Sequence, residues 1–368
     1  MSTGFFWDER CFWHAGGNYA FTMPIGGLVQ PLAAGGLPEN PETKRRLKNL
    51  MDVSGLTKQL DVRSAPEATY EALARVHPTS YLDEFKKMSD AGGGELGRRT
   101  PFAQGGYEIA ALSAGLAIDA VDAVASGALD NAYSLSRPPG HHCLPDFPNG
   151  FCLLANIPLA IGRARARGLA QRIAVLDWDV HHGNGTEAIH ADDADTLTVS
   201  IHQEANYPLD TGQFETDARA NLNIPLPPGS GHETYLEAME RLALPAIRAH
   251  RPDAIVVACG LDAALIDPLG RMMATAATFA AMTDQVMELA RDICGGRVAM
   301  AHEGGYSEAY VPFCGHAVIA RMAGSERAAP DPFAETFEKR QPGAGFARYA
   351  SSVIDAMVEA RASGGTEG

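Results

Sequence analysis

The stretch Ile173-Ala-Val-Leu-Asp-Trp-Asp-Val-His-His-Gly-Asn-Gly185 changes from an apolar run into carboxylates, imidazoles and glycines. Its first half has no helical period, which predicts a buried strand of a parallel sheet that is covered on both faces. Because alternate residues of an extended chain point to one side, Asp177, Asp179 and His181 are expected to face the same small space. Such a cluster is costly to bury without a partner, so the stretch predicts a metal site with Asp179 and His181 as zinc ligands.

Strands and helices alternate along the chain around this stretch. The alternation is typical of an α/β domain with a central parallel sheet flanked by helices. We expect the main domain to span residues 1–323. Residues 324–368 are expected to form an extension with one helix at 347–361, packed on the same domain or partly flexible. The predicted strands are 4–7, 131–136, 173–179, 197–202, 254–260 and 297–302, with a further short strand and a turn within 223–231. The predicted helices are 41–51, 67–76, 77–88, 106–124, 153–167, 233–250 and 276–293.

Composition and charge exclude several classes of protein. The 368 residues carry a net charge of −15, which argues against broad nucleic-acid binding. No run of residues reaches transmembrane length and the N-terminus lacks a basic, then apolar leader, so we expect a cytoplasmic chain that does not bind membranes. The six cysteines form no C-x-x-C pair, which indicates reduced thiols. We also expect a homo-oligomer.

Chemically reactive residues follow several of the predicted strands. Open parallel sheets bind ligands beyond the carboxyl ends of their strands, where the loops meet. The adjacent pair His141 and His142 follows one strand, and Asp267 and Tyr306 come in the loops after two others. We therefore expect these residues to join the 173–185 stretch in a single site at one edge of the sheet.

The predicted site divides into a metal centre and a pair of proton carriers. Asp179, His181 and Asp267 supply two carboxylates and one imidazole, which would leave a zinc-like ion positions for water and a substrate carbonyl. His141 and His142 lie in a proline- and glycine-punctuated loop and suit proton transfer, one from water and one to a leaving amine.

Each histidine of the pair needs a partner that fixes its tautomer. Asp177 and Asn184 are available for this role. If His141 faces Asp177 and His142 faces Asn184, the two imidazoles differ in basicity, because a carboxylate raises the pKa of an imidazole and a neutral amide does not. The sequence leaves open which histidine protonates the leaving amine.

Aromatic and glycine residues are expected to shape the rest of the site. Tyr306 lies in a glycine-flanked loop, where its hydroxyl could donate to the oxyanion of a tetrahedral intermediate, and Gly304 would allow that loop to approach closely. Phe151 and Tyr207 are expected to wall a narrow tunnel, and Gly150 and Gly304 are assigned with them to substrate binding.

Two further polar residues are interpreted as structural. His77 follows a predicted helix, where a cap or packing role is favoured over metal binding. Glu95 lies in a glycine-rich loop, where a solvated carboxylate is favoured over contact with a cationic substrate.

Three motifs resemble those of the zinc-dependent histone deacetylase superfamily. They are Arg137-Pro-Pro-Gly-His-His142, Asp177-Trp-Asp-Val-His-His-Gly-Asn-Gly-Thr186 and Glu303-Gly-Gly-Tyr-Ser307. They are most similar to class II-like bacterial histone deacetylase-like amidohydrolases and acetylpolyamine amidohydrolases, and the resemblance runs from about residue 4 to 323. It implies the arginase/deacetylase α/β fold with an eight-stranded parallel sheet, which would make residues 1–323 a deacetylase-like catalytic domain.

The resemblance implies a role for each matching residue. Zinc would be bound by Asp179, His181 and Asp267, the His141–His142 pair would act as general base and acid, and Tyr306 would stabilise the oxyanion, which is the assignment reached above from chemistry. It also implies a structural potassium ion beside the zinc. In the family this ion is held by the residues that match Asp177, the hydroxyl of Ser200 and the backbone of Asp179, His181 and Ile201.

Some positions depart from the commoner family pattern. Leu261 stands where class II-like relatives usually have an aromatic residue, and Cys143 where alanine is frequent, whereas Asn184 is the class II-like variant of an aspartate. Because the loops that carry Leu261 and Cys143 are expected to wall the tunnel, these departures put substrate shape in doubt rather than catalysis.

The expected substrate is a small-molecule or peptide N-acyl amine: acetyl-lysine, an acetylated polyamine or another small amide. Two alternatives stay open. The first is a ureohydrolase on the same fold with two manganese ions, and the second is a non-catalytic sensor of acyl ligands.

Overall fold

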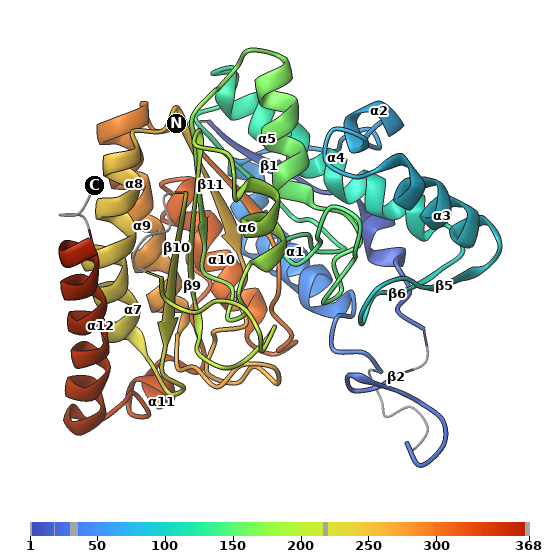
Figure 1. The fold of residues 1–368 in the computed structure, drawn as a ribbon. Coiled ribbons are helices and arrows are strands. Elements are labelled where there is room, and N and C mark those ends of the chain that lie inside the picture. The colour runs from blue at the N-terminus through green and yellow to red at the C-terminus, as the bar shows by residue number, and fades with distance from the viewer. Residues whose placement is uncertain (1, 18, 30–35, 216–219, 365–368) are drawn as a thin grey trace.

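The computed structural model describes residues 2–17, 19–29, 36–215 and 220–364. A central sheet runs through the molecule, with helices on both of its sides (Figure 1). The predicted eight-stranded parallel sheet is confirmed, and its order is β10-β9-β8-β11-β12-β7-β1-β4. These strands are Asn221–Leu226 (β10), Thr196–Gln203 (β9), Ile173–Asp177 (β8), Ala254–Cys259 (β11), Val298–His302 (β12), Asn131–Ser134 (β7), Thr3–Phe6 (β1) and Asp61–Arg63 (β4).

The strand order places the predicted site loops side by side. β7 and β8 are consecutive in this sheet along the chain, yet β11 and β12 lie between them. All four strands are parallel, so their carboxyl ends open at the same edge. β8 and β11 are buried along their whole length, as expected for apolar strands covered on both faces.

Two helical layers cover the sheet. α4 (Gly106–Ala125) packs on α5 (Asn156–Ala166), and α10 (Val311–Met322) packs on both α1 (Glu42–Ser54) and α9 (Ala276–Cys294). α4 is buried over most of its length because its many alanines allow close approach on several sides. The other helices are Tyr70–Leu73 (α2), Thr79–Asp90 (α3), Asn184–His190 (α6), His232–Ala238 (α7), Leu244–His250 (α8), Ala334–Glu338 (α11) and Ala344–Gly364 (α12), with short 3₁₀ turns at Glu9–Trp13 (η1) and Leu56–Gln59 (η2).

Several helices differ from the prediction. The helix predicted at 67–76 is reduced to the four residues of α2. The helix predicted at 233–250 is interrupted by a π-helical turn at Met239–Ala243 (η3), just before Pro245, which cannot donate a backbone hydrogen bond. α10 was not predicted: it is buried on several faces, so its sequence shows no clear amphipathic period.

The C-terminal segment packs against the main domain. The side chain of Phe337 is buried against the rings of Tyr310 and Phe333. The Gln341 side chain accepts a hydrogen bond from the backbone N–H of His232 at 2.9 Å and donates one to the backbone carbonyl of Met273 at 2.9 Å. α12 in turn contacts α7 and β10. Among the described residues, no helix combines the length and apolarity that crossing a membrane requires.

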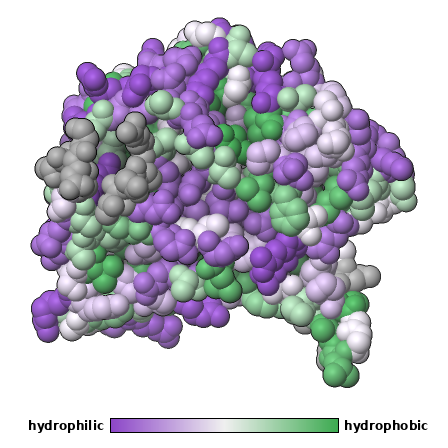
Figure 2. Space-filling model, viewed as in Figure 1, coloured by the Kyte–Doolittle hydropathy of each residue, from purple (hydrophilic) through white to green (hydrophobic). Residues whose placement is uncertain are grey.

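A short antiparallel arm projects from the body of the molecule. It is formed by β2 (Tyr19–Ala20) and β3 (Met23–Pro24), and Figure 1 shows it extending beyond the other elements. Its exposed apolar side chains are Phe21, Met23 and Leu28, and Figure 2 shows apolar surface at the end of this projection. A second small hairpin, β5 (Gly93–Glu95) and β6 (Pro101–Ala103), lies between α3 and α4 in the chain.

Candidate active site

The loops after β7, β8, β9, β11 and β12, together with the β2–β3 arm and the β5–β6 hairpin, line a cavity of about 120 Å³ at the edge of the sheet. Six residues assigned to the site from sequence line it: His142, Gly150, Phe151, His181, Tyr207 and Tyr306. The other lining residues are Phe21, Thr22, Arg99, Asn206 and Leu269. A larger hollow of about 480 Å³ lies between α7, the start of α9 and the C-terminal helices, and none of the predicted site residues lines it.

The two adjacent histidines have the partners anticipated from the sequence. Nδ1 of His141 donates to Oδ2 of Asp177 at 2.9 Å, and Nδ1 of His142 donates to Oδ1 of Asn184 at 2.8 Å. The two rings lie with their centroids 4.0 Å apart, and all four side chains are buried. Each partner therefore fixes one tautomer and leaves Nε2 of its histidine for other chemistry.

The two imidazoles differ in basicity in the direction that their partners imply. Burial opposes charging of His141, but the carboxylates of Asp179 and Asp177 raise its pKa well above the ordinary value. Burial lowers the pKa of His142 well below the ordinary value, and the neighbouring charges of His141 and His181 lower it further. Of the two adjacent imidazoles, His141 is therefore the more basic.

A buried group of candidate metal ligands lies beside this pair. Asp179, His181 and Asp262 each offer a ligand atom, and these atoms lie within 4.8 Å of one another. Oδ1 of Asp179 and Oδ2 of Asp262 approach the same nitrogen, Nδ1 of His181, at 3.0 and 3.1 Å. One N–H cannot satisfy two carboxylate oxygens, and Oδ2 of Asp262 has no well-aligned hydrogen-bond donor among the described residues. A cation among these three atoms would satisfy all of them.

Asp262 was not assigned from the sequence, which predicted Asp267 as the third ligand. The carboxylate of Asp267 lies outside the group within 4.8 Å and accepts backbone hydrogen bonds from Leu269 at 2.9 Å and Tyr306 at 2.7 Å. Burial and the charge of Asp262 raise the pKa of Asp267 to about 8, so the two carboxylates are close enough to interact. The ligand role of Asp267 stays a prediction, and Asp262 joins it as a candidate.

Glycines permit the close packing of the loops around these carboxylates. A Cβ atom on Gly304 would lie 2.1 Å from Oδ2 of Asp262, and the backbone N–H of Gly304 donates to Oδ2 of Asp179 at 2.8 Å. Gly304 therefore supports the carboxylates rather than the cavity wall to which the sequence assigned it. Gly150 does line the cavity, where a Cβ atom would lie 2.5 Å from the ring of His142.

Aromatic rings form the walls of the cavity. Phe151 and Tyr306 meet edge to face at 5.8 Å, and Tyr207 stands edge to face on His142 at 5.1 Å. Of the five described non-glycine residues with positive φ, three line this cavity: Phe21, Arg99 and Phe151. Such conformations are costly for L-residues and persist mainly where surrounding contacts impose them, which is common at functional sites.

Comparison with known proteins identifies the family. The histone deacetylase domain matches residues 37–322. The chain belongs to the histone deacetylase domain family. It is 56% identical over 362 residues to a histone deacetylase-like amidohydrolase of Pseudomonas aeruginosa, covering 97% of this chain and 95% of that one. It is 34% identical over 303 residues to a probable deacetylase of Archaeoglobus fulgidus, covering 79% and 84%.

The fold comparison agrees with this family. The crystal structure of the HDA15 HD domain superposes with a TM-score of 0.77 at 30% identity, covering 88% of this chain and 92% of that one. The fold is therefore the arginase/deacetylase fold that the sequence motifs implied. Together with the similarity to the amidohydrolase, this makes the chain a hydrolase of amide bonds and sets the ureohydrolase and sensor alternatives aside.

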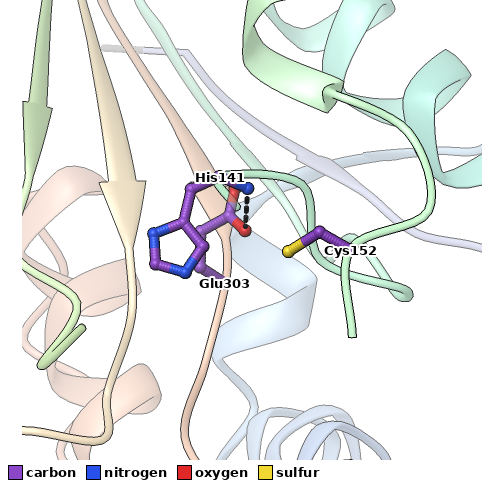
Figure 3. A group of neighbouring side chains, drawn as sticks. All are labelled: His141, Cys152 and Glu303. Carbon is purple, nitrogen blue, oxygen red and sulfur yellow. Dashed lines mark hydrogen bonds between the residues drawn. The ribbon is translucent and has the colours of Figure 1, made fainter. Parts of the chain in front are cut away.

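In this deacetylase domain, a glutamate missed by the sequence analysis supports the histidine loop. Glu303 is fully buried at the end of β12, and its Oε2 accepts hydrogen bonds from the backbone N–H groups of Gly140 at 2.7 Å and His141 at 3.1 Å. Figure 3 shows its carboxylate against the His141 backbone, with Cys152 on the neighbouring loop. The position of the glutamate directly before Gly304 was the available signal.

The arginine of the Arg-Pro-Pro-Gly-His-His motif is also structural. Arg137 is buried, and its guanidinium binds Glu39 at 3.0 Å and the backbone carbonyls of Cys11 and His14. Glu39 also pairs with the fully buried Lys44 at 3.1 Å. This network anchors the start of the histidine loop to the N-terminal segment.

The residues predicted to hold potassium lie on β8, on β9 and, for Asp179 and His181, in the loop after β8. Asp177 and Ser200 are register partners in β8 and β9, and Ile201 follows Ser200 in β9. The hydroxyl of Ser200 lies 2.9 Å from Nδ1 of His202, and Oδ1 of Asp177 accepts the backbone N–H of Asp179 at 3.0 Å. Potassium binding itself stays a prediction.

The two departures from the family pattern do not reach the cavity. Leu261 and Cys143 are both fully buried, and neither belongs to the lining residues. Leu261 packs under the loop of Gly305, and Cys143 clusters with Cys152. The loops that carry these two residues do contribute His142 and Leu269 to the cavity lining, but the side chains of Leu261 and Cys143 themselves point into the core.

Proposed function

We propose that the chain is a zinc-dependent deacetylase that hydrolyses the N-acetyl or short N-acyl amide of a lysine-like or polyamine-like amine. The observation that carries this proposal is the approach of Asp179 and Asp262 to one nitrogen of His181, at 3.0 and 3.1 Å, beside the paired His141 and His142. Two carboxylates and one imidazole are a donor set suited to a catalytic zinc ion, which keeps positions free for water and substrate.

The residues present fit such an ion. The ligand atoms are buried and lie within 4.8 Å of one another, and Oδ2 of Asp262 has no hydrogen-bond partner among the described residues. When bound, zinc would polarise the substrate carbonyl and lower the pKa of water at this site.

The histidine pair would move the protons of the reaction. His141 and His142 lie side by side, and Nε2 of His141 is 3.8 Å from Oδ2 of Asp179, so this ring faces the metal group. A general base must take a proton from the attacking water and a general acid must deliver one to the leaving amine, for which two imidazoles of unequal basicity are suitable. Asp177 and Asn184 hold the two rings in position throughout.

Tyr306 and the aromatic walls would complete the site. The Tyr306 ring lines the cavity with its centroid 6.5 Å from that of the His181 ring, which supports a role for its hydroxyl as a donor to a carbonyl oxygen that gains negative charge. Phe151 and Tyr207 narrow the entrance to the cavity. A narrow entrance favours a substrate that enters as a linear chain, and the aromatic walls would exclude water around that chain.

The remaining proposals concern the state of the protein. We propose that a potassium ion binds between β8 and β9 through Asp177, Ser200 and the neighbouring backbone. We further propose that the protein is cytoplasmic, that it binds neither nucleic acid nor membranes, and that it forms a homo-oligomer. The exposed apolar side chains of the β2–β3 arm support association, since such side chains gain from burial against a second surface.

A substrate panel with defined metal content tests this function. The zinc-loaded protein is assayed with acetyl-lysine peptides, acetylputrescine, acetylspermidine and simple anilides, and bound metals are counted. We expect one zinc per chain and release of acetate from at least one acetylated amine. Two manganese ions per chain with cleavage of a guanidinium would support a ureohydrolase, and tight ligand binding without turnover would support a sensor; either result overturns the proposal.

A further inference from the structure

We propose that Arg99 makes this site select substrates that carry a carboxylate a few bonds beyond the acylated amine, and reject those that carry further positive charge. This inference rests on the proposed deacetylase function and narrows its substrate class. Two sources share the chemistry: the α-carboxylate of a single N-acyl-lysine, and an acidic side chain next to an acyl-lysine in a peptide.

Arg99 lines the same cavity as the reactive residues. His142, His181 and Tyr306 line it together with Arg99. Among the described lining residues, Arg99 is the only one whose side chain carries a permanent charge, the others being apolar, neutral polar or imidazole groups. A substrate whose acyl group reaches the histidines therefore passes a fixed cation.

The backbone of Arg99 is held firmly. Its carbonyl accepts the N–H of Phe151 at 2.9 Å, and the carbonyl of Arg98 accepts the N–H of Gly150 at 3.0 Å. Arg99 and Phe151 both have left-handed φ angles, of 58° and 68°, and this pairing holds them against the ordinary preference of L-residues. The buried Thr100 follows directly. The guanidinium thus extends from a fixed base beside the cavity wall.

The guanidinium is available to a substrate. Its carbon lies 5.3 Å from the centroid of the Tyr207 ring, a cation–π contact, and its N–H groups form no hydrogen bond among the residues that the structure describes. Within the part of the chain that the structure describes, Arg99 forms no ion pair with a carboxylate. The nearby Glu95 is already engaged, since it accepts the Tyr19 hydroxyl at 2.6 Å and the Thr100 N–H at 3.2 Å. A guanidinium with a free edge binds a carboxylate through two parallel hydrogen bonds.

The same cation disfavours acetylated polyamines. The net charge of −15 attracts them at long range, but exposed charges are screened over about 8 Å in physiological salt. Inside the cavity, the permanent charge that lines the wall determines which substrates are favoured, and this charge is the positive guanidinium of Arg99. Glu95 was the acidic side chain considered from the sequence as a contact for a cationic substrate. Its carboxylate accepts a hydrogen bond from the Tyr19 hydroxyl instead.

Matched substrates of different charge test the proposal. One pair is Nα-capped Nε-acetyl-lysine as the free acid and as its uncharged amide; the second is a capped tripeptide with Glu or with Lys after acetyl-lysine; N-acetylputrescine is a further probe. For the zinc-loaded protein, we expect kcat/KM to favour the anionic member by about tenfold, a difference of about 1.4 kcal/mol. Arg99→Gln should bring the ratio close to one, and Arg99→Glu should invert it.

Arg98 provides a matched control. Its guanidinium carbon lies 5.7 Å from the same Tyr207 ring, but the residue lines a different cavity, so Arg98→Glu changes the net charge equally and leaves the site cation in place. This variant should keep the wild-type ratio. Each ratio compares the kcat/KM values of two substrates for the same protein variant. A partial loss of folding or of zinc lowers both values equally and therefore leaves the ratio unchanged.

The outcomes separate the two proposals. If the zinc-loaded protein does not hydrolyse the uncharged amide or any other acetylated probe, the deacetylase function fails. If the amide is hydrolysed but Arg99→Glu retains the wild-type ratios in both pairs, or if N-acetylputrescine is preferred to the amide, the role of Arg99 is overturned and the deacetylase function stands. A response in the amino-acid pair or in the tripeptide pair supports the role and identifies the source of the carboxylate.

Discussion

Nδ1 of His141 donates a hydrogen bond to Oδ2 of Asp177 at 2.9 Å, with both groups buried below the cavity. This contact joins the loop after β7 to the end of β8, two strands that are separated in the sheet by β12 and β11. The carboxylate fixes the tautomer of the ring and favours its charged form, whereas the amide of Asn184 fixes His142 without adding charge.

Replacing Asp177 with Asn should therefore impair proton transfer. We expect kcat to fall by about 10²-fold, within the range assigned to general acid–base catalysis. The pKa of His141 should fall at the same time, which would shift the pH profile of kcat/KM. The matched control is Asn184→Asp, which adds a carboxylate beside His142 and should raise the pKa of that ring. Equal profiles for wild type and Asp177→Asn at equal zinc content would contradict the role of this contact.

Tyr306→Phe removes one hydroxyl from the cavity wall and keeps the ring that packs edge to face on Phe151. We expect kcat to fall by about 10²-fold or more, as when one oxyanion donor is lost, with zinc content unchanged. Steady-state kinetics with metal analysis measures both quantities. Phe151→Leu is a useful comparison, since it changes the wall without removing a donor and should act mainly on KM. Full activity of Tyr306→Phe would exclude the oxyanion role.

The sequence predicts the parts of this site that lie close together in the chain or at strand ends. The 173–177 strand is apolar and unbroken, and its end places Asp179 and His181 in one group. The partners of the two histidines also followed from residue chemistry, because few side chains near a strand end can fix an imidazole tautomer. These inferences needed only local geometry and the shared edge of a parallel sheet.

The sequence does not predict which side chains in different loops face each other. Asp262 and Asp267 stand five residues apart in one irregular loop, and only the folded chain shows that Asp262 reaches His181 while Asp267 binds the Tyr306 backbone. Glu95 is exposed, as interpreted from the sequence, but the sequence did not predict that it accepts the hydroxyl of Tyr19, which lies 76 residues away. Contacts of this kind depend on loop conformation, which has no periodic signal.

Metal content should distinguish the two candidate ligands. If Asp262 is a ligand, Asp262→Asn should weaken zinc binding, because an amide is a poorer and uncharged donor. Asp267→Asn tests the assignment implied by the family resemblance. We expect that zinc dissociation constants measured by competition with a chelator rise by at least about tenfold for a direct ligand or its supporting partner. A variant that keeps wild-type affinity is removed from the ligand set, whatever its activity.

Glu303 should act through the position of His141. Its Oε2 accepts hydrogen bonds from two consecutive backbone N–H groups of the histidine loop, those of Gly140 and His141. Tyr306 follows Glu303 by three residues, so Glu303 connects the loop that carries His141 with the loop that carries Tyr306. Glu303→Ala leaves these N–H groups buried without an acceptor and should lower kcat more than it raises KM. Glu303→Gln keeps an acceptor oxygen and should recover most of the activity. Equal loss in both variants would point to the charge of Glu303 instead of its hydrogen bonds.

The buried histidine His77 should make the fold sensitive to acid. Nδ1 of His77 donates to the carbonyl of Pro145 at 2.7 Å, and Nε2 accepts the N–H of Ala155 at 3.1 Å, an arrangement that requires a neutral ring. Burial lowers its pKa from 6.5 to about 4. Between these values the unfolded chain binds a proton that the folded chain does not, so the free energy of unfolding falls as the pH falls from about 6.5 to 4, by about 3 kcal/mol at most from this group. His77→Gln should cost stability at pH 7, and its deficit against wild type should shrink towards pH 4 in denaturant titrations. A deficit that is constant across this range would show that His77 is protonated equally in both states.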